Sequence, residues 1–168
     1  GADDKSPDER PLKRMFLKGF YIDKYEVTNA QYKAVFLKHT YGKNEEKHPV
    51  RGVTWKQAAD YAAAVDKRLP TEEEWEKAAR GPNGNDYPWG ELFDSEKANT
   101  AMSRVVSTMK IGTFKQGVSE YGCYDMSRNV YEWTSTWYNP YEGNLDVDIE
   151  YGTVYRVLRG GSFNTDSF

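Results

Sequence analysis

The sequence predicts an α+β domain with three early helices, short strands in its second half and many long ordered loops. Three helix-start signals fall before residue 81, and glycines separate short aromatic segments after residue 83. Helices that come first and strands that follow are typical of the α+β class. The length of 168 residues suits one ordinary domain.

The first part of the chain is expected to be extended. Residues 1–14 are charged and contain two prolines, and residues 15–25 are rich in aromatic and aliphatic side chains, which predicts a strand.

Each predicted helix begins with a capping box. In this motif a threonine hydroxyl accepts a hydrogen bond from the N–H of the third helical residue, and the side chain of that residue accepts one from the threonine N–H. The boxes begin at Thr28, Thr54 and Thr71. Apolar residues at helical spacing follow each box. They predict helices over residues 28–39, 55–66 and 72–80.

The end of the chain predicts a strand from Tyr155 that enters a Gly-Gly turn before Phe163. A domain seldom stops directly after such a turn. We therefore expect the chain to be part of a longer protein, so the lack of a visible signal peptide says little about its compartment.

Composition excludes several classes of protein. The net charge is −3, so a nucleic-acid or anionic-membrane partner is not indicated. No apolar run approaches the ~18 residues of a membrane-spanning helix. The single cysteine, Cys123, excludes an internal disulfide and a cysteine-based zinc site. Aromatic residues make up 15% of the chain, which argues against disorder.

A more specific signal comes from a series of sequence blocks. The most distinctive are Lys67-Arg-Leu-Pro-Thr-Glu-Glu-Glu-Trp75, Tyr87-Pro-Trp-Gly90 and Arg159-Gly-Gly-Ser-Phe163. Further blocks lie at residues 20–32, 48–55, 98–100, 121–126 and 129–133. In order and content, the series resembles the formylglycine-generating enzyme and sulfatase-modifying factor family. The resemblance implies a C-type-lectin-like fold for one domain over residues 1–168, lacking the family's first strand and its C-terminal end.

The family resemblance also implies a test for catalysis. Its founding activity oxidises a substrate cysteine to formylglycine with copper held by two cysteine thiolates, soft ligands that suit Cu(I). At the first of these positions the chain has Thr165, which argues against copper binding and against an enzyme. The second position would lie beyond Phe168. Cys123 falls in another block and is interpreted as a small buried hydrophobic residue.

A second enzymatic branch of the family uses iron held by histidines. Neither His39 nor His48 has a histidine or carboxylate partner at the spacing this branch requires. His39 lies on the apolar face of the first predicted helix and is interpreted as structural. A metal role is not favoured for His48, which precedes a proline in a loop.

The resemblance further implies one structural calcium ion. Carried over, its ligands are the side chains of Asp125 and Glu132 and the carbonyls of Arg128 and Val130. Calcium binds six to eight hard oxygens, many of them from tight loops. The family has glycine where this chain has Arg128, so any positive φ there would be strained. The alternative is a metal-free loop in which Asp125 and Glu132 cap N–H groups, and we favour calcium.

The family's other calcium site would use Asn99 and the carbonyl of Thr100. It normally adds an acidic side chain, and residues 101–113 contain no Asp or Glu, which argues against this second site.

Two looser features each have two interpretations. Residues 146–150 alternate acidic and aliphatic side chains, which fits a solvent-facing edge strand better than a cation site. The aromatic residues of 137–141 could stack on a sugar or peptide, but aromatic core is the more common role.

Taken together, these observations favour a non-catalytic binding or structural module within a larger periplasmic or extracellular protein, with a protein partner or a glycan as ligand. The alternative is a copper-dependent formylglycine-generating oxidase whose active site lies partly beyond residue 168.

Overall fold

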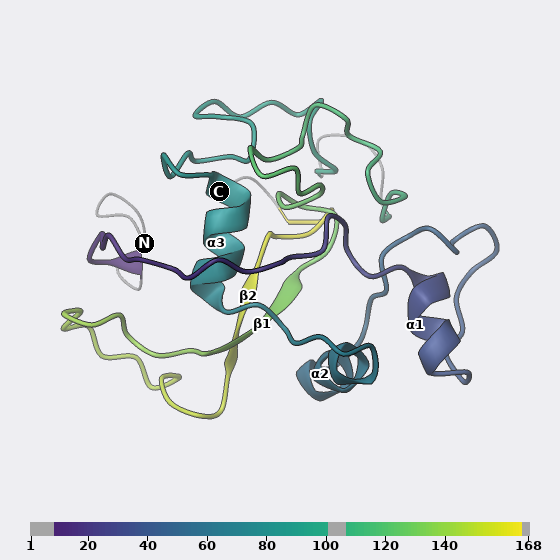
Figure 1. Ribbon diagram of the computed structural model, residues 1–168, viewed down its shortest axis with the longest axis horizontal. Helices are drawn as coiled ribbons and strands as arrows, with labels where there is room; N and C mark the ends of the chain where they lie inside the picture. Colours follow the sequence, from purple (N-terminus) through teal and green to yellow (C-terminus); the bar gives the residue numbers. More distant parts are fainter. Residues whose placement is uncertain (1–8, 101–106, 166–168) are drawn as a thin grey trace.

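The computed structural model describes residues 9–100 and 107–165. It contains helices α1 (Asn29–Val35), α2 (Trp55–Ala64) and α3 (Glu72–Arg80), followed by strands β1 (Glu132–Trp137) and β2 (Arg156–Arg159). Long irregular connections join them (Figure 1). The predicted α+β class is confirmed. Within the described residues, no helix is both long and apolar enough to cross a membrane.

All three predicted capping boxes are present. In each, the threonine hydroxyl accepts from the third helical N–H and the third side chain accepts from the threonine N–H. The predicted end of α1 near residue 39 is wrong, because Phe36 leaves the helical region with φ −109° and ψ 84°. His39 then folds back, its Nε2 lying 3.0 Å from Asn29 Oδ1 and its ring edge-on to Tyr32. These contacts fit a structural histidine.

The sheet consists of β1 and β2, which pair antiparallel with Glu132 opposite Arg159. As predicted, a Gly-Gly turn follows β2. Gly160 and Gly161 have φ values of 90° and 74°. A side chain at Gly160 would approach the Trp75 ring within 3.3 Å, so this turn lies directly against α3.

The predicted strand over residues 15–25 is wrong. The segment is irregular and lies in no sheet of the described residues. Its aromatic side chains explain the error, because Phe16 and Tyr21 are exposed to solvent rather than packed in a core. Composition alone suggested a strand, whereas a strand also needs a partner for its N–H and C=O groups.

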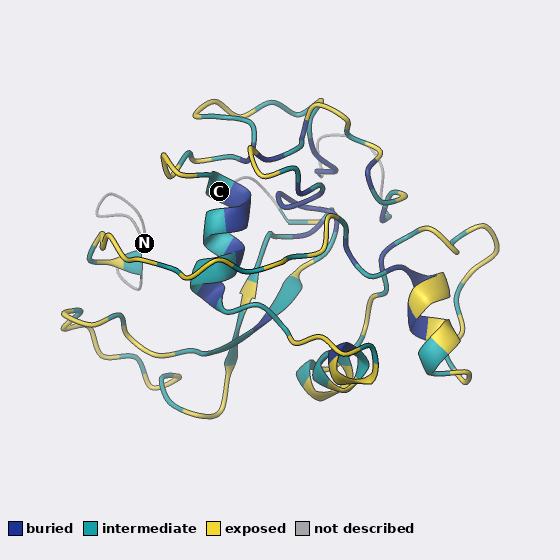
Figure 2. Cartoon of the chain, in the orientation of Figure 1, coloured by how far each residue is buried: buried dark blue, intermediate teal, exposed yellow. Residues whose placement is uncertain are grey.

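The core is centred on α3, whose buried face appears dark blue in Figure 2. The buried apolar side chains of this cluster are Trp75, Ala78, Ala79, Cys123 and Met126. The burial of Cys123 agrees with its interpretation as a small hydrophobic residue, and burial also raises the pKa of its thiol.

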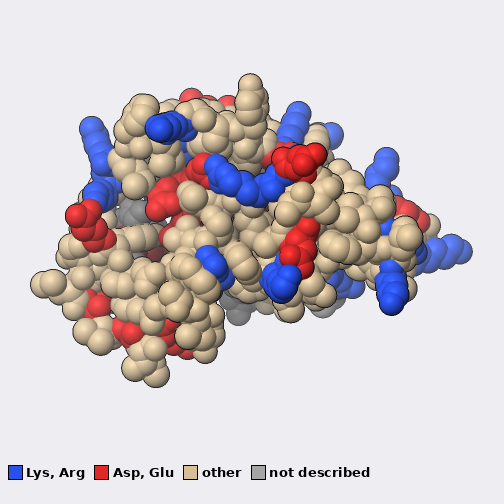
Figure 3. Space-filling view, turned by 60° about the horizontal axis from the view of Figure 1, so that its bottom comes forward, with Lys and Arg blue, Asp and Glu red and all other residues tan. Residues whose placement is uncertain are grey.

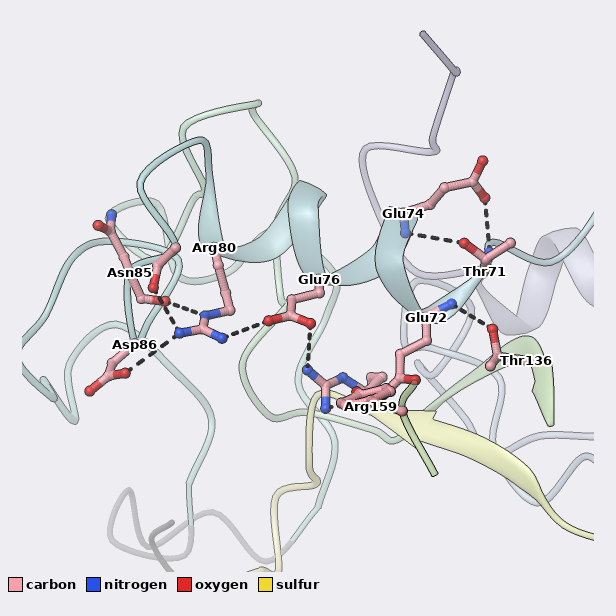
Figure 4. A network of polar contacts seen from close by, with 11 residues as sticks. Thr71, Glu72, Glu74, Glu76, Arg80, Asn85, Asp86, Thr136 and Arg159 are labelled. Carbon is pink, nitrogen blue, oxygen red and sulfur yellow. Dashed lines mark hydrogen bonds and ion pairs between the residues drawn. The ribbon is translucent and has the colours of Figure 1, made fainter. Parts of the chain in front are cut away.

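Polar contacts join α3 to the sheet (Figure 4). The guanidinium of Arg159, in β2, lies 3.6 Å from the Glu72 carboxylate and 3.8 Å from that of Glu76. Arg80 pairs with the same Glu76 at 2.6 Å. The N–H of Glu72 donates to the Thr136 hydroxyl at 2.9 Å. These contacts hold α3 across both strands.

Two indole N–H groups join the start of α2 to β1. Trp55 donates to the Thr134 carbonyl at 2.8 Å, and Trp133 donates to the Val53 carbonyl at 3.0 Å. The guanidinium of Arg156 lies 4.0 Å from the ring centre of Trp55 and 3.2 Å from that of Trp137. Trp137 is therefore engaged within the protein, which supports its interpretation as part of the aromatic packing.

Candidate functional site

The loop predicted to bind calcium leads directly into β1 and has an unusual backbone. Asp125, Arg128 and Asn129 have φ values of 60°, 82° and 72°. Non-glycine residues seldom adopt positive φ, and Arg lacks the local side-chain bonding that helps Asn and Asp to do so. Arg128 therefore has a backbone conformation that favours glycine, at a cost of about 1 kcal/mol.

Asn129 is the centre of a buried hydrogen-bond network. Its amide oxygen accepts from the N–H of Met109 at 2.9 Å and from Asn99 Nδ2 at 3.3 Å. Its amide nitrogen donates to Glu26 Oε2 at 2.7 Å. One side chain thus connects three segments that are far apart in the sequence. Neither Asn129 nor Glu26 is among the site residues predicted from the sequence, although each lies in one of the recognised sequence blocks.

Asn99 and Thr100, the residues of the doubtful second calcium site, are both buried. The side chain of Asn99 donates to the Ser107 carbonyl at 2.9 Å as well as to Asn129. The structure thus brings Asn99 to the first loop, where it acts as a structural link. Residues 101–106, the first part of the stretch 101–113 in which the family pattern would place an acidic ligand, lie outside the described residues.

Three buried carboxyl groups surround this network. Asp125 Oδ2 accepts from the N–H of Gly112 at 2.6 Å. Glu26 accepts from the N–H of Val130 at 3.3 Å in addition to its bond from Asn129. Glu132 Oε1 is buried and has no hydrogen-bond partner among residues 9–100 and 107–165. An unpaired buried oxygen is costly unless it is protonated or meets a cation.

The electrostatics of the three groups follow from this burial. Burial raises the pKa of Glu132 to about 7, and the charge of Asp125 adds to the rise. The indole N–H of Trp75 lies near the Glu132 carboxyl without meeting hydrogen-bond geometry, and it partly offsets the rise in the pKa of Glu132. Burial also raises the pKa of Glu26 well above its ordinary value, and repulsion from Glu132 and Asp125 contributes. The three carboxyl groups thus lie in an environment that disfavours their ionisation, and ionisation of one disfavours that of the others.

The donor set fits a hard divalent cation chemically. Asp125 and Glu132 supply carboxylate oxygens, and the loop between them supplies carbonyls. A bound ion would depend on those carbonyls, because the described part of the chain has no group of three or more His, Cys, Asp or Glu side chains that could hold a metal.

Thr165, at the first copper-cysteine position, is held by several hydrogen bonds. The buried guanidinium of Arg128 donates to its carbonyl at 2.7 Å and also to its hydroxyl. The hydroxyl donates to the Ser162 carbonyl at 2.8 Å and accepts from the Ser162 N–H at 3.0 Å. Thr165 and Arg128, both of which depart from the family pattern, therefore contact each other.

A groove with a volume of about 570 Å³ opens beside this site. Its walls come from residues 19–27, from α2 and the segment that follows it, and from residues 130–133. The aromatic side chains of Tyr21, Tyr61 and Trp133 line it together with Glu26 and Glu132. Aromatic walls with a few convergent polar groups are typical of ligand-binding grooves.

Comparisons with known proteins agree with this fold. The sequence model of the "Sulfatase-modifying factor enzyme 1-like domain" matches residues 1–168. The chain is 37% identical over 199 aligned residues to "Serine/threonine-protein kinase Pkn1" of Chlamydia trachomatis, covering 98% of this chain and 31% of that protein. It is 40% identical over 125 residues to "Inactive C-alpha-formylglycine-generating enzyme 2" of Bos taurus, covering 68% of this chain and 38% of that protein.

A solved structure has the same fold. "Treponema denticola variable protein 1" superposes with a TM-score of 0.67 at 21% identity, over 84% of this chain and 74% of that one. The chain spans about a third of the length of the two curated relatives described above.

Proposed function

We propose that this chain, which belongs to the sulfatase-modifying factor enzyme 1-like family, is a non-catalytic binding module of a larger protein. The hydrogen bonding of Thr165 carries this proposal. Copper-dependent cysteine oxidation needs a thiolate here, and an alcohol is a poor ligand for Cu(I). The Thr165 hydroxyl is moreover engaged by Ser162 and by the buried guanidinium of Arg128.

The only cysteine of the chain, Cys123, does not replace the missing ligand. It is buried in the core cluster with Trp75 and Met126, and its raised thiol pKa disfavours the thiolate that copper needs. The relatives give further support. One is named an inactive enzyme, and the match to the kinase covers only a third of a longer protein. We propose that the groove beside Glu26 and Glu132 receives a protein segment or a glycan.

An oxidase assay tests the absence of catalysis. We expect the protein, mixed with a cysteine-containing sulfatase peptide, copper and oxygen, to leave the thiol unchanged by mass spectrometry. An active copper oxidase of the family, run in parallel, is the positive control. Conversion of the peptide cysteine to an aldehyde would contradict the proposal and favour the oxidase alternative.

As a second part of the proposal, the loop from Asp125 to Glu132 binds one calcium ion that serves the structure. The support is the unpaired, buried Glu132 oxygen and the mutual repulsion of the carboxylates, both of which a divalent cation would relieve. A site with two carboxylates suits the weaker range of calcium affinities, which is typical of extracellular modules. The proposal therefore places the parent protein outside the cytoplasm, in the periplasm or beyond the cell.

Thermal unfolding with calcium and then with a chelator tests this ion. Because only the folded state forms the site, calcium should stabilise the protein by ~2.7 kcal/mol at a hundred-fold excess over the dissociation constant. Glu132→Gln should reduce the effect, because calcium affinity follows ligand charge. Glu91→Gln, at an exposed position of the same residue type, is the matched control. Equal midpoints with calcium and with chelator would show that the loop is held by hydrogen bonds alone.

A further inference from the structure

The connection between β1 and β2 presents a strip of aliphatic side chains to solvent. Leu145, Val147 and Ile149 are 92%, 94% and 98% exposed. Val147 and Ile149 lie in the alternating segment 146–150, and Leu145 directly precedes it. The edge strand expected there is wrong, because the structure has no strand over these residues. Single exposed aliphatics are ordinary, but a contiguous exposed set marks an interaction surface.

Local hydrogen bonds explain why these side chains point outward. The Asn144 side chain accepts from the N–H of Asp146 at 2.8 Å, and the Asp148 side chain accepts from the N–H of Glu150 at 2.8 Å. The Tyr138 hydroxyl donates to the other oxygen of Asp148 at 3.2 Å. The polar side chains of Asn144 and Asp148 thus bond to groups of the protein itself, and the aliphatic side chains near them face solvent. The strip is therefore formed by the fold itself.

A second exposed apolar set lies on the neighbouring lead-in segment. Leu12, Met15 and Phe16 are exposed, Phe16 to 90%. Lys13 pairs with Glu142, at the start of the strip's loop, so the two segments are neighbours. Pro11 also lies against this loop, since a Cβ placed on Gly143 would be 3.7 Å from its ring.

The charges that flank the two apolar sets are opposite. The lead-in carries the exposed basic residues Arg14 and Lys18, whereas the loop carries the exposed acidic residues Asp146 and Glu150. Both segments lie on the left side of Figure 1, and on that side of Figure 3 blue side chains lie above red ones that are set in uncharged surface. The surface thus combines a basic half, an acidic half and exposed apolar side chains in both.

We propose that this surface pairs two copies of the chain through a two-fold axis, with the basic lead-in of each copy packed on the acidic loop of the other. A two-fold interface uses the same patch on both copies, so the patch must be complementary to itself. Opposite charges on its two halves meet that condition, and the apolar residues supply the area to be buried. The dimer uses neither the groove nor the calcium loop, so its failure and that of the proposed function are separate outcomes.

Sedimentation velocity over a concentration series tests the apolar contribution. The protein should shift from monomer to dimer with increasing concentration, and higher salt should shift it back. Val147→Ser should weaken dimerisation about tenfold or more, because it removes apolar area from the interface in both copies without adding a charge that the basic lead-in could pair with. Leu37→Ser, at a comparably exposed leucine just after α1, on the opposite side of Figure 1, is the control and should leave dimerisation unchanged.

A charge-exchange experiment tests the two-fold arrangement itself. One variant carries Arg14→Glu and Lys18→Glu, so both of its halves are acidic, and another carries Asp146→Lys and Glu150→Lys, so both are basic. Each variant alone should be monomeric because like charges would face each other. Their equimolar mixture should form a heterodimer, since each acidic half then meets a basic one. A monomeric wild-type protein at every concentration, or a mixture that fails to associate, would overturn the proposal.

Discussion

Replacing Asn129 with alanine should lower the free energy of unfolding by about 3–5 kcal/mol. The change removes the bonds to Met109, Asn99 and Glu26 together. It also leaves the buried Glu26 carboxyl without its strongest donor, and a buried group that has lost its partner incurs most of its desolvation cost. Chemical denaturation of the wild-type and variant proteins, compared at one pH, measures the loss.

Asn44 provides a matched control for this substitution. It is also an asparagine with positive φ, 67°, but it is exposed and lies outside the network. Asn44→Ala should therefore lower the free energy of unfolding by only about 1 kcal/mol, which is the cost of placing alanine in the left-handed region. Similar losses in the two variants would show that backbone conformation, and not the network, explains the effect at Asn129.

The calcium-free protein should lose stability as the pH rises through the titration of Glu132. The folded state raises the pKa of this carboxyl from 4.5 to about 7, so it holds more protons than the unfolded chain over that interval. Stability then falls with rising pH, by about 3 kcal/mol across the interval. This is the reverse of a carboxylate in an ion pair, whose contribution is lost on acidification. The raised pKa of Glu26 acts in the same direction.

Unfolding free energies measured in chelator between pH 4 and pH 8 test this slope. Glu132→Gln keeps the shape of the side chain without its charge, so the variant should have a flatter profile and exceed the wild type above pH 7. The exposed Glu91→Gln variant should follow the wild-type profile. If the wild type and Glu132→Gln gave parallel profiles, Glu132 would not be the group that titrates.

The sequence predicted those features that local chemistry determines. Capping boxes act within four residues, so the starts of all three helices were recovered at Thr28, Thr54 and Thr71. The end of α1 was placed too late, because the turn of His39 back to Asn29 depends on contacts that apolar spacing does not encode. The strand expected over residues 15–25 failed for a related reason. Strand pairing depends on a partner elsewhere in the chain.

In the candidate site, too, the features determined locally could be predicted, and the contacts between distant residues could not. Family resemblance indicated the loop from Asp125 to Glu132 and a position in it, Arg128, where the family has glycine, and the structure gives Arg128 a positive φ. Nothing local linked Glu26 to that loop, since the bond from Asn129 joins residues 103 positions apart. The contact between Arg128 and Thr165 could not be predicted from the sequence either, because each residue was noticed only as a separate departure from the family pattern.

The paired indole bonds of Trp55 and Trp133 bear on how the chain reaches this structure. Each joins groups about 80 residues apart, so neither can form until most of the intervening chain has been brought together. Closing a loop of that length lowers the entropy of the chain before any favourable contact can compensate for the loss. In a domain with little regular structure, such distant contacts rather than local helices set the pace of folding. We therefore expect this chain to fold more slowly than a helical bundle of the same length.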